Sequence, residues 1–126
     1  MGDDTLLKRI NDAIQAFERG YWPIETDYER RVISLLMEAR DELERLMPII
    51  LERQRQDAKW GEQNHADEWW HLIMGEEYGE LAKALLELHF AYPGATQDHI
   101  RKELIETIAV GIAWLECMDR RRMSDG

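Results

Sequence analysis

Apolar residues recur every three or four positions along most of the chain, which is the spacing of one face of an α-helix. One such stripe consists of Trp70, Met74, Glu77, Leu81, Ala84 and Leu88. The apolar-polar alternation of a β-strand is not sustained over any useful length. We therefore predict an all-α fold: an antiparallel bundle of about five helices that are joined by short loops.

Capping and turn residues divide the chain into the expected helices. Thr26-Asp27-Tyr28-Glu29 has the pattern of a capping box. Pro48 is expected to interrupt the helix that follows and to start a short third helix, and Asn64 is a candidate cap for the fourth. Glycine and proline mark loops at Gly20 to Pro23, at Gly61 and at Ala91–Ala95. The expected helices span about residues 5–19, 26–47, 48–59, 66–90 and 97–121.

Composition excludes several classes of protein. The net charge of −10 argues against a protein that binds nucleic-acid phosphates. No run of residues reaches the roughly 18 apolar positions that a membrane span requires. Cys117 is the only cysteine, so it cannot form an intramolecular disulfide, and it is expected to be a small core residue. We expect a cytoplasmic protein with no nucleic-acid or membrane partner.

Glu76-Glu77-Tyr78-Gly79-Glu80 places three carboxylates within the fourth expected helix. Glu77 falls on the apolar stripe, where an unpaired buried charge is costly. Glu80 is three residues further along and lies near Glu77 on the helix surface. A cation, a proton or a metal ion must therefore offset the charge.

The next expected helix carries a second carboxylate pair, Glu103 and Glu106, again on a stripe that turns apolar further along. In an antiparallel hairpin the two pairs lie at similar heights, given a rise of about 1.5 Å per residue. Four converging carboxylates favour Mg²⁺ or Mn²⁺, and such an ion suits phosphate-containing substrates. Glu76 is a candidate general base.

Two other interpretations remain open. The four acids could be structural or solvent-exposed, because a single E-x-x-E pair on a helix is common. A redox metal is the other alternative, but di-iron carboxylate bundles use Glu-x-x-His pairs, and none occurs at these positions. The polar segment that holds Lys59, Trp60 and Gln63 is likewise either a binding surface or a solvated loop beside a tryptophan that plugs the edge of the core.

Three segments together resemble the MazG-like all-α nucleoside triphosphate pyrophosphohydrolases. They are Glu76 to Glu80 followed after residues 81–102 by Glu103-Leu104-Ile105-Glu106, the segment Glu52–His65, and the segment Ile108–Glu116. The family pattern is E-E-x-x-E followed by E-x-x-D, so Glu106 stands where Asp is usual.

This resemblance implies hydrolysis of nucleoside triphosphates, deoxynucleotides above all, to the monophosphate and pyrophosphate. It implies Mg²⁺, with Mn²⁺ as a substitute, and a homodimer or homotetramer. It places the catalytic core at residues 51–122, with a helical extension at 1–50 and a disordered tail at 123–126. The roles that it implies are catalytic for Glu76 and Glu77, metal-binding for Glu77, Glu80, Glu103 and Glu106, and substrate-binding for Lys59, Trp60 and Gln63. The alternative on the same scaffold is a catalytically silent nucleotide-binding or helical interaction protein.

Overall fold

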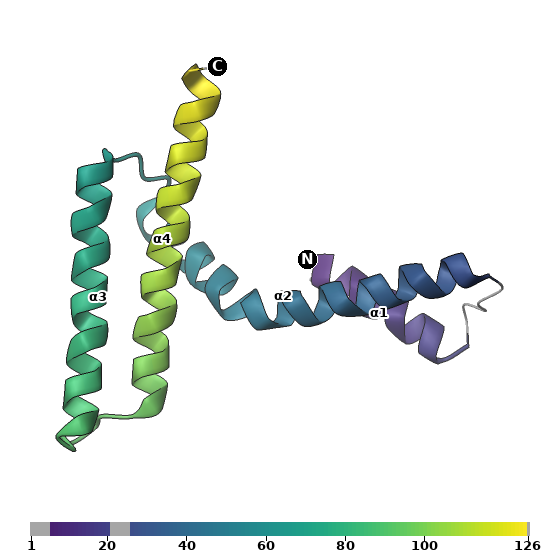
Figure 1. Cartoon of the computed structure of the whole chain (residues 1–126), viewed down its shortest axis with the longest axis horizontal. Coiled ribbons are helices and arrows are strands. Elements are labelled where there is room, and N and C mark those ends of the chain that lie inside the picture. Colours follow the sequence, from purple (N-terminus) through teal and green to yellow (C-terminus); the bar gives the residue numbers. More distant parts are fainter. Residues whose placement is uncertain (1–5, 21–25, 126) are drawn as a thin grey trace. The chain divides into compact units, whose positions relative to one another are not determined.

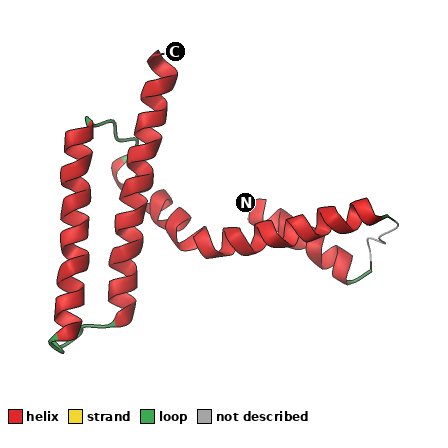
Figure 2. Ribbon diagram, viewed as in Figure 1, coloured by secondary structure: helices red, strands yellow, loops and turns green. Residues whose placement is uncertain are grey.

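The computed structural model describes residues 6–20 and 26–125. These residues form four α-helices and no strand, which confirms the all-α class (Figures 1 and 2). The helices are α1 (Leu6–Glu18), α2 (Asp27–Trp60), α3 (Asp67–His89) and α4 (Gln97–Asp125). None of the described helices is both long enough and apolar enough to cross a membrane.

The prediction of five helices is wrong, because α2 continues through Pro48. Proline in a helix interior removes one backbone hydrogen bond and crowds the preceding turn. The neighbouring side chains Met47, Ile49 and Ile50 are all partly buried, and this packing outweighs the local preference for a break. The proline nevertheless lies at a boundary: the chain divides into two compact units, residues 1–47 and 48–126, and α2 belongs to both.

The first unit consists of α1 and the beginning of α2, with Ile10, Ile14 and Ile33 as its buried apolar residues. The predicted capping box is confirmed. The Thr26 amide donates to Glu29 Oε2 at 2.9 Å, and the Glu29 amide donates to Thr26 Oγ1 at 3.2 Å. The predicted loop at Tyr21-Trp22-Pro23 lies outside the described residues, and a separate role for residues 1–50 stays a prediction.

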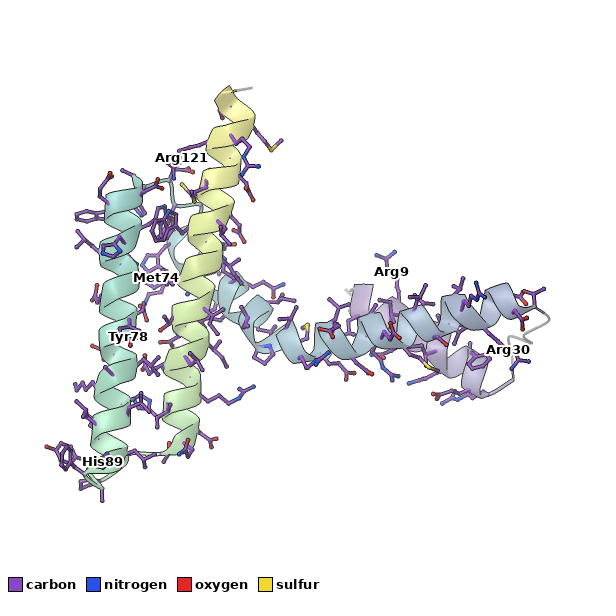
Figure 3. All side chains as sticks on the ribbon, viewed as in Figure 1. Arg9, Arg30, Met74, Tyr78, His89 and Arg121 are labelled. Carbon is purple, nitrogen blue, oxygen red and sulfur yellow. The ribbon has the colours of Figure 1, made fainter. Side chains whose placement is uncertain are left out.

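The second unit is built on an antiparallel hairpin of α3 and α4, which lie side by side (Figure 1). Its core contains Trp70, Val110, Ala113 and Cys117, with Ile73, Met74 and Trp114 packed against it. Met74 lies between the two helices in Figure 3. A Cβ atom at Gly111 would lie 3.3 Å from Met74 Cε, so a glycine here lets the helices approach closely.

The ends of the hairpin differ in detail from the prediction. Ala66, not Asn64, is the N-cap of α3, and no side chain caps that helix. The loop between α3 and α4 is confirmed, with Ala91 and Gly94 both at positive φ. Thr96 Oγ1 accepts a hydrogen bond from the His99 amide at 3.1 Å and so caps α4. This helix runs on to Asp125, beyond residue 122, where the ordered core was expected to end.

Candidate functional site

Three carboxylates converge between α3 and α4. Glu77 comes from α3, while Glu103 and Glu106 come from α4, and one oxygen of each lies within 4.8 Å of the others. Glu103 is only 7% exposed, and the other two are partly buried. The arrangement follows from the helical spacing, because each acid lies on a stripe whose other members form the core of the hairpin.

The electrostatics of this group are unfavourable for three charges. Burial raises the pKa of Glu77 above its usual value, and repulsion from Glu106 and Glu103 raises it further. Burial also raises the pKa of Glu103, and charge repulsion and hydrogen bonding from Glu106 raise it further, while the charges of His99 and Lys102 act in the opposite direction. The group therefore has a marked affinity for positive charge, whether a proton or a metal ion.

Two side chains provide part of that charge. Lys102 Nζ lies 3.3 Å from Glu106 Oε1, and His99 Nε2 lies 3.8 Å from Glu103 Oε1. The Lys102 side chain is 66% exposed and that of His99 is 42% exposed, so solvent weakens both interactions. The sequence analysis did not find them, although their spacing of i,i+4 along one helix was the available signal.

A cavity of about 280 Å³ opens beside the acids. Its wall includes the predicted site residues Glu76, Glu77, Glu106, Trp60 and Gln63. The remaining lining residues are Glu52, Arg55, Gln56, Trp70, Ile73, Val110 and Ala113. Acids thus meet an aromatic and aliphatic surface in one open cavity, which is large enough for part of a planar organic ligand.

Two predicted residues are placed differently. Glu80 is exposed and lies outside the group of three, although it is only three residues from Glu77 on α3. Its charge is still near enough to raise the pKa of Glu77. Lys59 does not line the cavity; its Nζ lies over the Trp60 ring, 4.5 Å from the ring centroid.

The end of α2 contributes side chains that the sequence analysis did not assign. Arg55 Nη2 lies 2.6 Å from Glu52 Oε1, and this hydrogen bond, with the charges of Glu106 and Glu77 adding to it, raises the pKa of Arg55. Gln56 is 8% exposed, and its Oε1 accepts a hydrogen bond from Arg53 at 3.1 Å. The signal in the sequence was a polar stripe at four-residue spacing, Glu52, Gln56 and Trp60, in a segment expected only to be helical.

The group of three carboxylates could hold a metal ion. All three donors are hard oxygens, the ligands that Mg²⁺, Ca²⁺ and Mn²⁺ prefer. The group contains neither cysteine nor histidine as a donor, so its chemistry does not favour zinc.

Comparison with known proteins adds no family to these observations. No protein-family model matches the chain. No curated protein matches it. No solved structure matches it either. The likeness to MazG-like enzymes therefore depends on the motifs in the sequence, and it enters the argument as a proposal.

Proposed function

We propose that this protein is a Mg²⁺-dependent nucleotide pyrophosphohydrolase of the MazG-like type. It hydrolyses nucleoside triphosphates, deoxynucleotides above all, to the monophosphate and pyrophosphate. The observation that carries the proposal is the convergence of Glu77, Glu103 and Glu106 within 4.8 Å at a cavity that also holds Trp60. A nucleotide with its cation combines the same features, since it has a planar base at one end and metal-bound phosphates at the other.

Glu77, Glu103 and Glu106 would hold the ion as oxygen donors. Bound Mg²⁺, or Mn²⁺ in its place, would supply a Lewis acid for the phosphoryl oxygens and a water molecule of lowered pKa. We retain Glu80 as a fourth ligand with a smaller contribution, because it is exposed and lies outside the group of three. The raised pKa values of Glu77 and Glu103 support this assignment, because a divalent ion would offset both the burial of their charges and the repulsion between them.

The other residues act on the substrate. Glu76 lies at the cavity and is exposed, so it can accept the proton of the attacking water. The water adds to the α-phosphorus, the bond from that phosphorus to the bridging oxygen breaks, and pyrophosphate leaves with the bond electrons. Trp60 offers a surface for stacking on the base, and Gln63 offers an amide. Lys59 lies over Trp60 and outside the cavity wall, so we keep it as a substrate contact of smaller weight.

Pyrophosphate release tests the proposal. Purified protein is incubated with each canonical dNTP and NTP in Mg²⁺, and pyrophosphate is measured separately from orthophosphate. Glu77→Gln keeps the shape of the side chain and removes its charge, so we expect the rate to fall by at least about 100-fold. Glu68→Gln, an exposed acid near the start of α3, is the control and should retain activity. Release of pyrophosphate at an equal rate by Glu77→Gln and the native protein would refute the assignment.

We also propose that the protein is a homodimer or homotetramer. One face of α4 exposes Leu104, Ile108, Leu115 and Met118, with exposed fractions between 39% and 59%. Their spacing is that of a seam that packs against another helix, and α3 likewise exposes Trp69, Leu72 and Leu85. Light scattering of the native protein and of Leu115→Glu tests this, and a monomeric native protein would refute it.

The same apolar faces favour the second candidate function, a catalytically silent nucleotide-binding or interaction protein. Such a protein would use the hairpin as a binding surface, and its acids would be only structural. Nucleotide binding in calorimetry without release of phosphate would favour this candidate, and pyrophosphate release would exclude it.

A further inference from the structure

The loop between α2 and α3, residues 61–66, carries Gln63 to the wall of the cavity described above. This loop has no regular secondary structure, and its main internal contact is a hydrogen bond from Asn64 Nδ2 to Glu62 Oε2 at 3.0 Å. The conformation of Gln63 therefore depends on how the rest of the unit holds the loop.

One side chain of α4 provides most of that support. Arg120 Nη2 donates to the Gln63 carbonyl oxygen at 2.9 Å, and Arg120 Nε donates to Asn64 Oδ1 at 3.0 Å. The same Nε lies 3.3 Å from Glu62 Oε1. One turn earlier in α4, Cys117 Sγ donates to the His65 carbonyl oxygen at 3.6 Å. Arg120 thus contacts three consecutive residues of the loop.

The chemistry of arginine suits this task. A guanidinium group presents several N–H donors in a rigid plane, whereas a lysine ammonium is a point charge on a flexible stem. Because the carbonyl of Gln63 is held, the direction in which its side chain leaves the backbone is held as well. Gln63 is partly buried and shares the cavity wall with Trp60 and Trp70.

We propose that Arg120 is a positioning residue that sets the base preference of the site by holding Gln63 in place. The inference rests on the proposed function, since it assigns the Trp60 end of the cavity to the nucleobase. An amide has a donor and an acceptor side by side, and it pairs best with a base edge that offers the complementary pair. A freely moving Gln63 would lose this discrimination, while the acids and their chemistry would stay in place.

The kinetic test compares Arg120→Ala and Arg120→Lys with Arg122→Ala in the presence of Mg²⁺. Arg122 lies on the same helix, its side chain is 84% exposed, and its ion pair with Asp119 is long at 3.8 Å, so it is a matched control. For Arg120→Ala we expect KM for the preferred nucleotide to rise about 10-fold, the loss of a positioned hydrogen bond, with kcat within about twofold. KM for the poorest nucleotide should change little. The selectivity ratio, which is kcat/KM for the preferred nucleotide divided by kcat/KM for the poorest one, should therefore fall about 10-fold. Arg120→Lys should recover only part of the ratio.

A second measurement does not depend on turnover. Amide hydrogen exchange of residues 62–66 should accelerate in Arg120→Ala and stay unchanged in Arg122→Ala. Unchanged exchange would overturn the role of Arg120 in holding the loop. Faster exchange with an unchanged selectivity ratio would overturn its role in base preference.

The outcomes also separate this inference from the proposed function. If the native protein releases no pyrophosphate, titration with non-hydrolysable α,β-imido nucleotides, followed by tryptophan fluorescence, measures base preference as binding. A preference that is lost in Arg120→Ala would support the positioning role and refute only the hydrolysis. A native protein that neither hydrolyses nor binds any nucleotide would overturn both.

Discussion

A group of three acids and a single acid on the same hairpin have opposite electrostatic surroundings. In the middle, Glu77 and Glu103 face Glu106, and burial together with mutual repulsion raises the pKa of both residues. At the end nearest the loop from α2, Asp67 accepts hydrogen bonds from Arg121 and from Trp114 Nε1, and these two contacts lower its pKa. The same two helices therefore pair one acid with donors and leave the other acids facing one another.

Other arginines of the second unit do pair with acids, so the lack of an arginine partner at the middle group is informative. Arg53 pairs with Glu116 at 2.7 Å, but the guanidinium nearest the middle group, that of Arg55, pairs with Glu52. The middle group is left with Lys102, which is largely exposed, and with His99, which is partly exposed. Local electrostatic cost is common where a protein binds a ligand, because binding relieves it. We therefore expect the middle group to bind an ion, and we expect the acids that pair with arginines, Asp67 and Glu116, to stabilise the fold.

The largest effect should come from adding the ion. At a concentration about 100 times its Kd, Mg²⁺ should stabilise the native protein by about 2.7 kcal/mol. Thermal melting with and without the ion measures this, and Glu103→Gln should remove most of the gain. Asp67→Asn changes an acid outside the middle group and should keep the full stabilisation by Mg²⁺. An equal gain in both variants would show that the middle group is not where the ion binds.

The next effect concerns the ion pair between Arg53 and Glu116. Arg53→Ala should lower the free energy of unfolding by about 1–2 kcal/mol, because it removes the hydrogen-bond donor of the buried Gln56 amide oxygen as well as the cation beside Glu116. The Arg53 side chain is 12% exposed, whereas that of Arg45, also on α2, is 68% exposed and pairs with Glu42. Arg45→Ala should therefore cost less than about 0.5 kcal/mol in the same urea titration. An equal loss of unfolding free energy in Arg53→Ala and Arg45→Ala would mean that the contacts of Arg53 add no stability beyond those of an exposed ion pair.

A smaller effect is the dependence of stability on pH. An acid whose pKa is raised by folding stabilises the folded state below its unfolded pKa and loses that contribution as pH rises through the folded pKa. Glu103 has a raised pKa, so without Mg²⁺ Glu103→Gln should gain stability relative to the native protein as pH rises through and above the usual range of a glutamate. Asp67 has a lowered pKa, so the loss in Asp67→Asn should shrink as pH falls over the acid range. Urea titrations at several pH values measure both, and a flat difference for Glu103→Gln would contradict the raised pKa.

The smallest effect separates Glu80 from its neighbour. Because Glu80 is exposed and lies outside the group of three, Glu80→Gln should reduce the stabilisation by Mg²⁺ by less than about 1 kcal/mol. Glu77→Gln should reduce it much more in the same melting experiment. If the two substitutions were equally severe, Glu80 would have to turn inward when the ion binds.

Helical periodicity explains what could be predicted. The stripe through Trp70, Leu81 and Ala84 is buried as predicted. Glu77 is partly buried on the same face, because it is seven residues after Trp70 and four residues before Leu81. The second stripe, with Glu103 and Val110, is also buried. Convergence of the acids follows from two such stripes in a hairpin, so short-range geometry was enough.

The parts that were missed depend on packing. Pro48 carries a strong local signal for a break, and only the burial of the apolar residues around it decides otherwise. Gln56 and Arg55 reach the cavity because the end of α2 packs beside α4. The four-residue spacing of Glu52, Gln56 and Trp60 marks one face of the helix, but it does not say what that face packs against. Glu80 stays a predicted ligand, and the structure places it as an exposed residue outside the group of three.

The contacts of Asp67 have a further consequence, for the register of the hairpin. The loop at Ala91–Ala95 joins α3 and α4 covalently at one end, and Asp67 hydrogen-bonds the first turn of α3 to Trp114 and Arg121 at the other. In Figure 3, His89 marks the end with the loop and Arg121 marks the opposite end. A slip of one helical turn would move the facing residues by about 5.4 Å and would break both contacts of Asp67. Such a slip would also carry Glu103 and Glu106 past Glu77. The contacts of Asp67, the first residue of α3, thus help to fix the register in which the three acids come together.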